Sequence, residues 1–443
     1  MAIDQQQAST LFCELGEEFV KVPNPNYVFP PYEIYALAKS KKEGLSELKA
    51  VVMDMDGTTT TTEELCIYSL EYMVRRMRGH LSKEAWEGLV EKDYPNIIGN
   101  STTKHVEYLI DTYGDAFVED EIQEGFLYAA AWTLALGKDE KRKEEVKLTL
   151  KKLGLQGFED QDWRSLLALS KVEQIEILKQ KFGGRMLPMD RALQLSVAID
   201  IYYQKYHELL VEISQGNAEQ VRKEVFGEGH TGKHLIEPMK GIGVLLPMMK
   251  GWLGKDIEAL LPKFFEESAL SLTEEEKQLA TEKLIAYSVQ FEQQPLKVGL
   301  VTSSIFYEAD IVIREVFAVL QEWIETTALP QDKKTFIQQQ LKDYHKVYDT
   351  FVTASDSSEI RLKPHRDLYS IALYQLGIAP EDFDKVAGFE DSQSGTIAIR
   401  AAGIGLCIAV PFAQTAGHDL GAATFVCSGG VPEVLLKHHL FLN

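Results

Sequence analysis

The sequence predicts an α/β fold, with a Rossmann-like parallel sheet core and a large inserted α-helical cap domain. Two observations support this prediction. Five short apolar segments rich in β-branched residues are typical of buried strands, and helical patterns separate the later ones, as in a doubly wound sheet. The segment between the first two strands, 55–296, is too long for one crossover connection and shows helical periodicity over most of its length.

The expected strands are hydrophobic runs, and several of them end at a small or acidic residue where a loop begins. They are LKAVVMD (48–54), KVGLVTS (297–303), DTFVTA (349–354), DKVAGFE (384–390) and GIGLCIAV (403–410). The expected helices between the later strands cover 306–322, 366–377 and 393–402. In an open α/β sheet the active site lies outside the carboxyl ends of the strands, so the loops after these segments are the candidate site.

The domain boundaries follow from where strand signals give way to helical ones. We expect an N-terminal extension at 1–45, a core at 46–62 and 237–443, and a helical cap domain at 63–236. A helical insertion at about 255–295 interrupts the core, and a capping-box pattern at Thr273 marks a helix start within it. The extension contains VPNPNYVFPPYEIY (22–35), which suggests an extended arm packed on the body.

The charge balance limits the classes of partner. The chain of 443 residues carries 46 Lys+Arg against 67 Asp+Glu, a formal net charge of -21. A surface this acidic repels nucleic acid and anionic lipid, so neither is expected as a partner. It also repels a phosphorylated substrate at long range, and a phosphate site must therefore be a local patch of metal, lysine and backbone amides.

The expected location is the cytoplasm. The four cysteines lie far apart without paired spacing, which argues against a disulfide framework or a Cys/His metal site. The N-terminal residues MAIDQQQASTLF lack a basic leader and an apolar stretch, and no apolar run reaches membrane-spanning length. The oligomeric state is not readable from the sequence.

The strongest motif is VVMDMDGT (51–58), in which a strand ends in two aspartates followed by Gly-Thr. Gly57 permits the bend that the chain needs here. Asp54 at the strand end could attack phosphorus, and Asp56 could exchange a proton with the entering or leaving oxygen. A carboxylate nucleophile needs a metal to screen its charge against a phosphate. The alternative is a pair of acidic residues in a solvated turn.

Two further loops place polar groups at the same edge of the sheet. In VGLVTSS (298–304), Thr302 and its neighbour Ser303 could hold a phosphoryl oxygen together with helix amides, although hydroxyls here also suit plain helix capping. In RLKPHRDLY (361–369), Lys363 precedes a proline in extended geometry. It could neutralise both a phosphate and the crowded carboxylates, or be an ordinary surface lysine.

The fourth loop supplies metal ligands. In VAGFEDSQSGTIAIRAAG (386–403) a strand ends in Glu390 and Asp391, and Ser-Gln-Ser-Gly then opens a helix. Adjacent carboxylates at a strand end suit a hard divalent ion such as Mg2+. We expect Asp391 to be the principal ligand, and Glu390 to be a second ligand or a partner of a metal-bound water. Because all four loops follow strands of one sheet, the sequence predicts phosphoryl transfer with magnesium at a single site.

These loops resemble those of the haloacid dehalogenase-like superfamily, on its phosphatase and beta-phosphoglucomutase branch. The matching residues are DMDGT (54–58), Thr302, TASDSSEIRLKPHRDLYSIAL (353–373) and GFEDSQSG (388–395). The resemblance implies a Rossmann-like core with a helical cap inserted after the first strand. It also implies Asp54 as the nucleophile, Asp56 as the general acid/base, Thr302 and Lys363 as phosphate binders, and Asp54, Asp56 (through its carbonyl) and Asp391 as Mg2+ ligands.

The resemblance extends to the cap but has limits. IIGNSTTKHVEYLI (97–110) is similar to the cap loop that reaches the substrate in this branch, which makes Lys104 and His105 candidate substrate contacts, unless both are exposed helix residues. The Asp-Ser-Glu that usually follows the first motif is absent, since 58–62 are all threonine. The cap is larger than usual, and extra residues separate Thr302 from Lys363. These differences leave the substrate undetermined.

Several functions are compatible with these residues. In a Mg2+-dependent phosphatase, Asp54 attacks a small phosphorylated metabolite and water then releases phosphate. In a phosphomutase of the beta-phosphoglucomutase type, a sugar hydroxyl replaces water, and Asp56 serves both reactions. A non-catalytic binding or scaffold protein would use the insertions 256–294 and 320–348 as partner surfaces, but it predicts a broken catalytic loop and all four are whole. A phosphonate hydrolase has no positive support, and dehalogenation needs neither a magnesium site nor the second aspartate.

Overall fold

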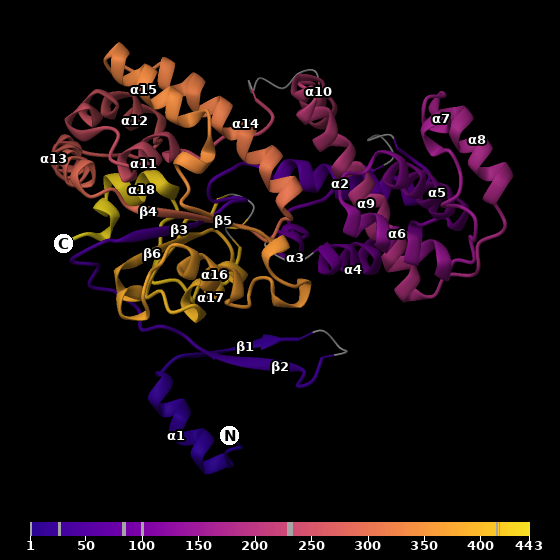
Figure 1. Cartoon of the computed structure of the whole chain (residues 1–443), viewed down its shortest axis with the longest axis horizontal. Helices are drawn as coiled ribbons and strands as arrows, with labels where there is room; N and C mark the ends of the chain where they lie inside the picture. Colours follow the sequence, from indigo (N-terminus) through magenta and orange to yellow (C-terminus); the bar gives the residue numbers. More distant parts are fainter. Residues whose placement is uncertain are drawn as a thin grey trace. The chain divides into compact units, whose positions relative to one another are not determined.

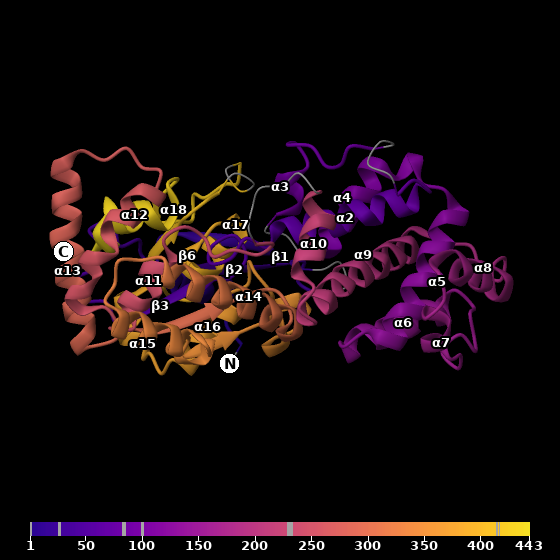
Figure 2. The same ribbon diagram turned by 90° about the horizontal axis from the view of Figure 1, so that it is seen from above.

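The computed structural model describes residues 2–24, 28–81, 86–98, 102–227, 234–412, 415 and 417–443. The chain divides into two compact units, one formed by the residues up to Thr62 with Ile236–Asn443 and the other by Glu63–Leu235. The first unit holds the β-sheets, and the second is helical in its described part (Figures 1 and 2). None of the described helices has the length and apolar character needed to cross a membrane.

A parallel six-stranded sheet forms the centre of the first unit, so the predicted fold class is confirmed. Its strands lie in the order β5-β4-β3-β6-β7-β8, and neighbouring strands are parallel. They are β3 (Ala50–Asp54), β4 (Lys297–Val301), β5 (Thr350–Val352), β6 (Val386–Glu390), β7 (Leu406–Ala409) and β8 (Phe425–Val426). The first five lie within the expected segments, whereas the edge strand β8 is not predicted.

The central strand β3 determines where the candidate site lies. All five of its residues are buried, and its neighbours are β4 on one side and β6 on the other. Because helices cover both faces of a parallel sheet, such a strand is apolar along its length and does not alternate. The carboxyl end of β3 therefore carries Asp54 into a buried position between the ends of two other strands.

Helices cover both faces of this sheet. They are α11 (Ile242–Met249), α12 (Leu261–Glu267), α13 (Glu274–Gln293), α14 (Phe306–Glu325), α15 (Gln331–Leu341), α16 (Asp367–Gln375), α17 (Gln393–Ala401) and α18 (Gly430–Leu436), with the 3-10 turns η2 (Gly254–Ala259), η3 (Tyr344–Lys346), η4 (Ala354–Asp356), η5 (Glu359–Arg361), η6 (Pro380–Lys385) and η7 (His439–Phe441). Figure 1 shows α16 and α17 on one face and α11, α14 and α18 on the other. Tyr369 and Ile399 pack with Val52 in the buried cluster under α16 and α17.

The segment 255–295 contains η2, α12 and α13, and α13 begins where the sequence predicts. The Thr273 hydroxyl accepts a hydrogen bond from the Glu276 amide at 3.2 Å, and the Glu276 carboxylate accepts one from the Thr273 amide at 2.7 Å. This reciprocal capping box satisfies two of the donors that a helix start leaves unpaired. The segment 320–348 contains the end of α14, then α15 and η3.

The N-terminal extension begins with α1 (Gln5–Leu15) and continues as an antiparallel hairpin of β1 (Phe19–Pro23) and β2 (Tyr32–Ala36). Residues 25–27 of the expected arm lie outside the described part. One face of the hairpin packs on the core, where Val22 and Tyr35 form a cluster with Ala401 at the end of α17. The extended arm is thus confirmed, and it is paired with itself rather than single-stranded.

The second unit consists of helices α2 (Glu63–Met77), α3 (Tyr94–Ile97), α4 (Thr102–Tyr113), α5 (Glu119–Leu136), α6 (Glu140–Lys152), α7 (Trp163–Leu167), α8 (Lys171–Phe182), α9 (Arg191–Ser214) and α10 (Ala218–Phe226), and the 3-10 turn η1 (Gly114–Ala116). The long helix α9 contacts α2, α4, α5, α6 and α10 and so forms the axis of this unit.

Candidate active site

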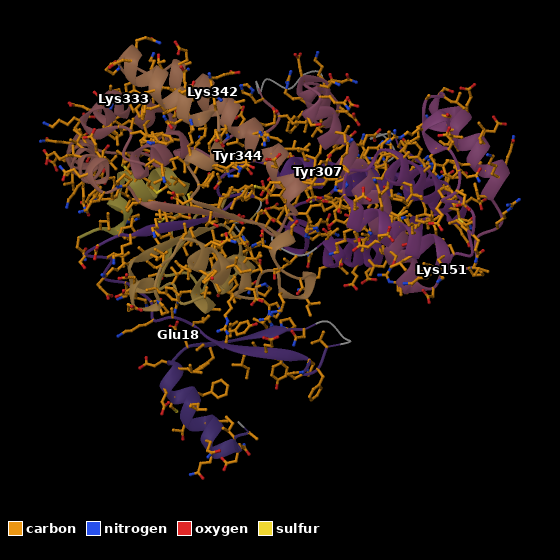
Figure 3. The ribbon with its side chains drawn as sticks, viewed as in Figure 1. Glu18, Lys151, Tyr307, Lys333, Lys342 and Tyr344 are labelled. Carbon is orange, nitrogen blue, oxygen red and sulfur yellow. The ribbon has the colours of Figure 1, made fainter. Side chains whose placement is uncertain are left out.

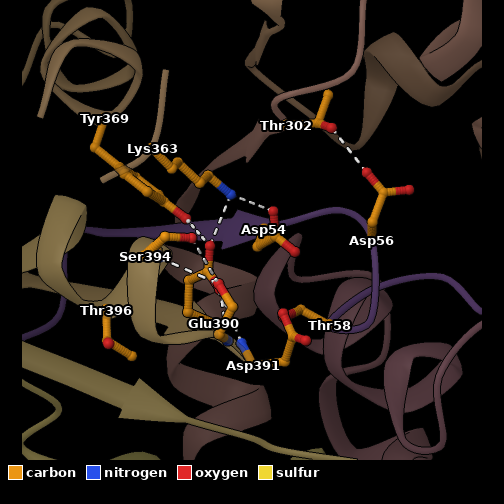
Figure 4. Close-up of polar contacts among 12 residues, drawn as sticks. Asp54, Asp56, Thr58, Thr302, Lys363, Tyr369, Glu390, Asp391, Ser394 and Thr396 are labelled. Atoms are coloured by element: carbon orange, nitrogen blue, oxygen red, sulfur yellow. Dashed lines mark hydrogen bonds and ion pairs between the residues drawn. The ribbon is translucent and has the colours of Figure 1, made fainter. Parts of the chain in front are cut away.

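The candidate site lies at the carboxyl ends of three neighbouring strands (Figure 4). Asp54 is the last residue of β3, Thr302 directly follows β4, and Glu390 is the last residue of β6. All three side chains are buried, and Asp54 keeps only 5% of its surface exposed. Parallel strands deliver their final residues to one edge of the sheet, which is why residues far apart in the sequence meet here.

The chain turns sharply after Asp54. Gly57 adopts a φ of 81°, a left-handed conformation that residues with a side chain rarely adopt. The Met55 carbonyl accepts hydrogen bonds from the amides of Thr59 and Thr60, both at 2.9 Å, which closes the turn. The predicted bend at Gly57 is confirmed, and the side chain of Asp56, just before it, lies beside Thr302 at the end of β4.

Lys363 joins two carboxylates from different strands. Its ammonium group donates to Oδ1 of Asp54 and, at 2.7 Å, to Oε1 of Glu390. The Lys363 side chain is only 7% exposed. The ammonium also lies 5.2 Å from the ring centre of Tyr369. Lys363 is therefore a buried ion-pair bridge and not a surface lysine.

The Glu390 carboxylate is fully engaged by the protein. Oε1 accepts hydrogen bonds from Lys363 and, at 3.2 Å, from the Tyr369 hydroxyl. Oε2 accepts from the Asp391 amide, from the Ser392 amide and from the Ser392 hydroxyl, at 3.0, 3.0 and 2.9 Å. This arrangement fixes Glu390 as an anchor for Lys363.

Burial and the neighbouring charges shift the pKa values of all three groups. Burial opposes the charged form of Lys363, but the Asp54 and Glu390 carboxylates outweigh it and raise the pKa of the ammonium group. Burial also favours neutral Glu390, but Lys363 and Ser392 lower its pKa. Burial and repulsion from Glu390 raise the pKa of Asp54 well above its ordinary value, which Lys363 only partly offsets. Lys363 thus stabilises the charged form of Glu390 and partly that of Asp54, and a bound cation would lower the pKa of Asp54 further.

The acidic cluster fits a hard divalent ion. One ligand atom each from Asp54, Glu390 and Asp391 lies within 4.8 Å of the others, and all three residues are buried. Lys363 neutralises only part of this buried negative charge, and oxygen-rich sites of this kind suit magnesium. Because both Glu390 oxygens already accept hydrogen bonds, Asp54 and Asp391 are the residues that fit the ion best.

Hydroxyl groups surround Asp56. Oδ2 accepts hydrogen bonds from Thr302 at 2.8 Å and from Ser304 at 3.4 Å, and Oδ1 accepts one from Thr62. The Thr302 hydroxyl in turn accepts the Ser304 amide at 2.9 Å. Donors on both oxygens hold the Asp56 carboxyl group in one orientation beside the end of β4.

The remaining residues predicted as phosphate or substrate contacts are Ser303, Lys104 and His105, and they belong to different units. Ser303 is exposed beyond the end of β4, next to the buried Thr302. Lys104 and His105 lie on α4 in the second unit, where Lys104 is exposed and His105 is buried. Both residues therefore belong to the helical unit and not to the unit that contains the strand ends. Residues 99–101 of the predicted cap loop lie outside the described part.

Several residues of the candidate site were not singled out by the sequence analysis. These are Thr62 and Ser304 beside Asp56, Tyr369 and Ser392 beside Glu390, and Thr58, whose hydroxyl donates to Oδ1 of Asp391 at 3.4 Å. The run of five threonines was a signal for Thr58 and Thr62, since both belong to the turn after the first motif. Tyr369 had no comparable signal, because a tyrosine in an apolar helix is typical of a core position.

Comparisons with known proteins give only low structural similarity. No protein-family model and no curated protein matches the sequence. Among solved structures, the chain is similar to CbbY from Rhodobacter sphaeroides in complex with phosphate, at 14% identity and a TM-score of 0.37, covering 87% of this chain and 96% of CbbY. It is also similar to a HAD family hydrolase from Deinococcus radiodurans with bound phosphate and sodium, at 13% identity and a TM-score of 0.38, covering 90% and 99%.

A third similar structure is a putative beta-phosphoglucomutase from Thermotoga maritima, at 16% identity and a TM-score of 0.31, covering 89% of this chain and 99% of the other. Identities and TM-scores this low say nothing about activity, so the function must be argued from the site residues themselves.

Proposed function

We propose that the chain is a Mg2+-dependent phosphatase that acts on a small phosphorylated metabolite of the cytoplasm through an aspartyl-phosphate intermediate. The observation that supports this most directly is the ion-pair bridge from Lys363 to Asp54 and Glu390. It places an ammonium group beside a buried carboxylate at a strand end, where charge on a transferring phosphoryl group would need stabilisation.

The two aspartates divide the proposed chemistry. An oxygen of Asp54 forms a bond to phosphorus as the bond to the leaving oxygen breaks, and protonated Asp56 gives its proton to that oxygen. Asp56 then takes a proton from water while the water oxygen attacks phosphorus, and the Asp54–phosphorus bond breaks to release phosphate. The Thr62 hydroxyl holds Asp56 in the orientation that both proton transfers need.

The other residues would neutralise and hold the phosphoryl group. Asp54 and Asp391, with the Asp56 carbonyl, would hold Mg2+, which when bound offsets the charge between carboxylate and phosphate. Ser303 would donate to a phosphoryl oxygen. The Thr302 hydroxyl and the Gly57 amide, which donate to Asp56 and to the Thr60 carbonyl, would turn to the phosphoryl group when it binds. Glu390 would act mainly by fixing Lys363, and Lys104 and His105 on the cap would contact the rest of the substrate.

The test is a panel of phosphomonoesters assayed for phosphate release with Mg2+ and with a chelator. We expect Asp54→Asn to lower kcat/KM by on the order of 1,000-fold or more, since it removes the nucleophile. The exposed Asp332→Asn, in the first turn of α15, is the matched control and should leave activity unchanged. Mass spectrometry of acid-quenched protein should find a phosphoryl group on Asp54.

Each outcome of the panel separates the alternatives. Full activity in Asp54→Asn, or activity that persists in the chelator, would overturn the proposal. An isomerised sugar phosphate without released phosphate would show a mutase instead. A wild-type protein without turnover on any phosphoester would favour a binding or scaffold protein.

A further inference from the structure

The N-terminal arm, defined as residues 2–24 and 28–45, has one face turned to the core and one to solvent. In β2 the residues alternate: Tyr35 is buried, whereas Tyr32 and Ile34 on the opposite face are exposed. In β1, Val22 is buried beside Glu33, its register partner. The alternation shows that the hairpin offers one defined surface to the loop beneath it.

That inner surface bonds directly to the loop that carries Lys363. Nη1 of Arg361 donates to Oε1 of Glu33 at 2.6 Å. The Tyr35 hydroxyl donates to the other Glu33 oxygen at 2.6 Å and lies 2.7 Å from Nδ1 of His365. Since the single hydroxyl proton goes to Glu33, Nδ1 of His365 carries its own proton and donates to Tyr35. A continuous hydrogen-bonded chain therefore joins the arm to the loop.

These contacts bracket Lys363 on both sides. Arg361 and His365 lie two residues before and two residues after it, and Arg361 also pairs with Asp367 at the start of α16 through two bonds of 2.8 Å. The residues between η5 and α16 belong to neither a helix nor a strand. One turn bond, from the His365 amide to the Leu362 carbonyl at 3.0 Å, holds their backbone, and side-chain contacts supply the remaining restraint.

The arm is also fastened to the helix that follows the acidic loop. Arg400, near the end of α17, is 1% exposed and donates to the Ala38 carbonyl at 2.7 Å and to the Ser40 hydroxyl at 2.9 Å. It also pairs with Glu18, which precedes β1 and is labelled in Figure 3. Since α17 begins directly behind Asp391, the arm spans two of the segments that build the site.

We propose that the N-terminal arm is a positioning element of the active site, in which Glu33 and Tyr35 hold the Lys363 loop so that the ammonium group meets Asp54. This inference rests on the proposed function for its effect on rate. The role of Lys363 makes the positioning matter, because a lysine has a long flexible side chain and its head group stays in place only if its backbone does. A small displacement of a catalytic group lowers the rate steeply.

The experiment compares Tyr35→Phe with Tyr32→Phe, the same change on the exposed face of the same strand. We expect Tyr35→Phe to lower kcat about tenfold, because the loop loses its link through His365 while the ring still packs. The concentration of Mg2+ that gives half-maximal activity should stay unchanged, since Asp54 and Asp391 are not touched. Tyr32→Phe should match the wild type. Glu33→Gln is a second variant, expected to act in the same direction.

A second measurement does not depend on turnover. Acylation of lysines by a small reagent, followed by mass spectrometry, reports how accessible Lys363 is. We expect Lys363 to react several-fold faster in Tyr35→Phe than in wild type, with Lys49 and Lys385 as unchanged internal references. A Tyr35→Phe protein with wild-type kcat and wild-type labelling would overturn the inference. If the wild-type protein has no phosphatase activity, the proposed function fails and the labelling alone decides whether the arm positions Lys363.

Discussion

Among single residues, Gly395 shows how closely the site is packed. A β-carbon at this position would lie 1.6 Å from Oε1 of Glu390 and 1.8 Å from its carboxyl carbon. The Glu390 carboxylate cannot move aside cheaply, because Lys363 and Ser392 hold its two oxygens. The Glu390 carboxylate therefore occupies the space that a side chain at position 395 would need.

We expect Gly395→Ala to lower kcat/KM about 100-fold and the free energy of unfolding by about 1–3 kcal/mol, because the methyl group displaces Glu390 and with it Lys363. Helix propensity alone predicts a gain of about 1 kcal/mol, since Gly395 lies within α17. Steady-state kinetics and denaturant unfolding measure the two effects. Gly114→Ala is the control, because a β-carbon there would lie 3.5 Å from Cγ2 of Ile110, an ordinary contact. It should leave kcat/KM unchanged. A Gly395→Ala protein that is both stabilised and fully active would contradict this account.

The sequence predicts the charged members of the site better than their hydroxyl partners. Asp54, Lys363 and Asp391 occupy strand ends or a Lys-Pro turn, where a charged side chain beside apolar runs stands out. Thr62, Ser304 and Tyr369 do not stand out, because a hydroxyl serves equally well as a cap, a solvated group or a buried donor. The role that a given hydroxyl group takes depends on the residues that pack around it in the folded protein.

Among the helices and strands, those that the sequence predicts best are the strands whose burial on both faces requires apolar residues. Strands β3, β4 and β6 are apolar because both of their faces are covered, and all were expected within a few residues of their observed bounds. Strand β8 has only two residues, Phe425 and Val426, and exists through its pairing with β7. Two residues show no periodicity, so the sequence contains no signal for it.

Helix α13 offers a test of stability that leaves the site untouched. We expect Thr273→Ala to lower the free energy of unfolding by about 1 kcal/mol, because the Glu276 amide loses its acceptor. kcat/KM should not change, since α13 packs mainly on η2, α11, α18 and η7. Thr335→Ala, an exposed position within α15, is the control and should be neutral or slightly stabilising. Equal unfolding midpoints for the two variants would show that the capping box contributes nothing.

At the scale of the whole molecule, the proposed chemistry lies in the first unit, and the second is a helical insertion. The chain passes from the core into the insertion at Thr62–Glu63 and returns at Leu235–Ile236. Helical periodicity identifies which face of each helix is buried within the insertion, but it carries no signal for which exposed residues contact a ligand. The sequence therefore supports a role for the loops of the candidate site from their own chemistry, whereas the roles of Lys104 and His105 stay predictions from resemblance.

The second unit has a polar interior of its own along α9. Asp200 is 1% exposed, and its Oδ1 accepts a hydrogen bond from Nη2 of Arg142 at 2.8 Å. Arg142 also pairs with Glu145 at 2.7 Å, so it keeps a counter-ion if Asp200 is neutral. Burial, only partly offset by Arg142, raises the pKa of Asp200 to about 6. The stability of this unit should therefore depend on pH in a defined direction.

In the unfolded chain an aspartate has a pKa of about 3.9, so between this value and about 6 the folded state binds more protons at Asp200. The contribution of neutral Asp200 is present below about pH 4 and is lost as the pH rises through 6. We expect Asp200→Asn to gain stability relative to wild type between pH 4 and 7, by up to about 3 kcal/mol. Urea unfolding at several pH values measures the difference, with the exposed Asp160→Asn as control. A difference that stays flat, or that falls with rising pH, would show that Asp200 is already ionised at pH 4.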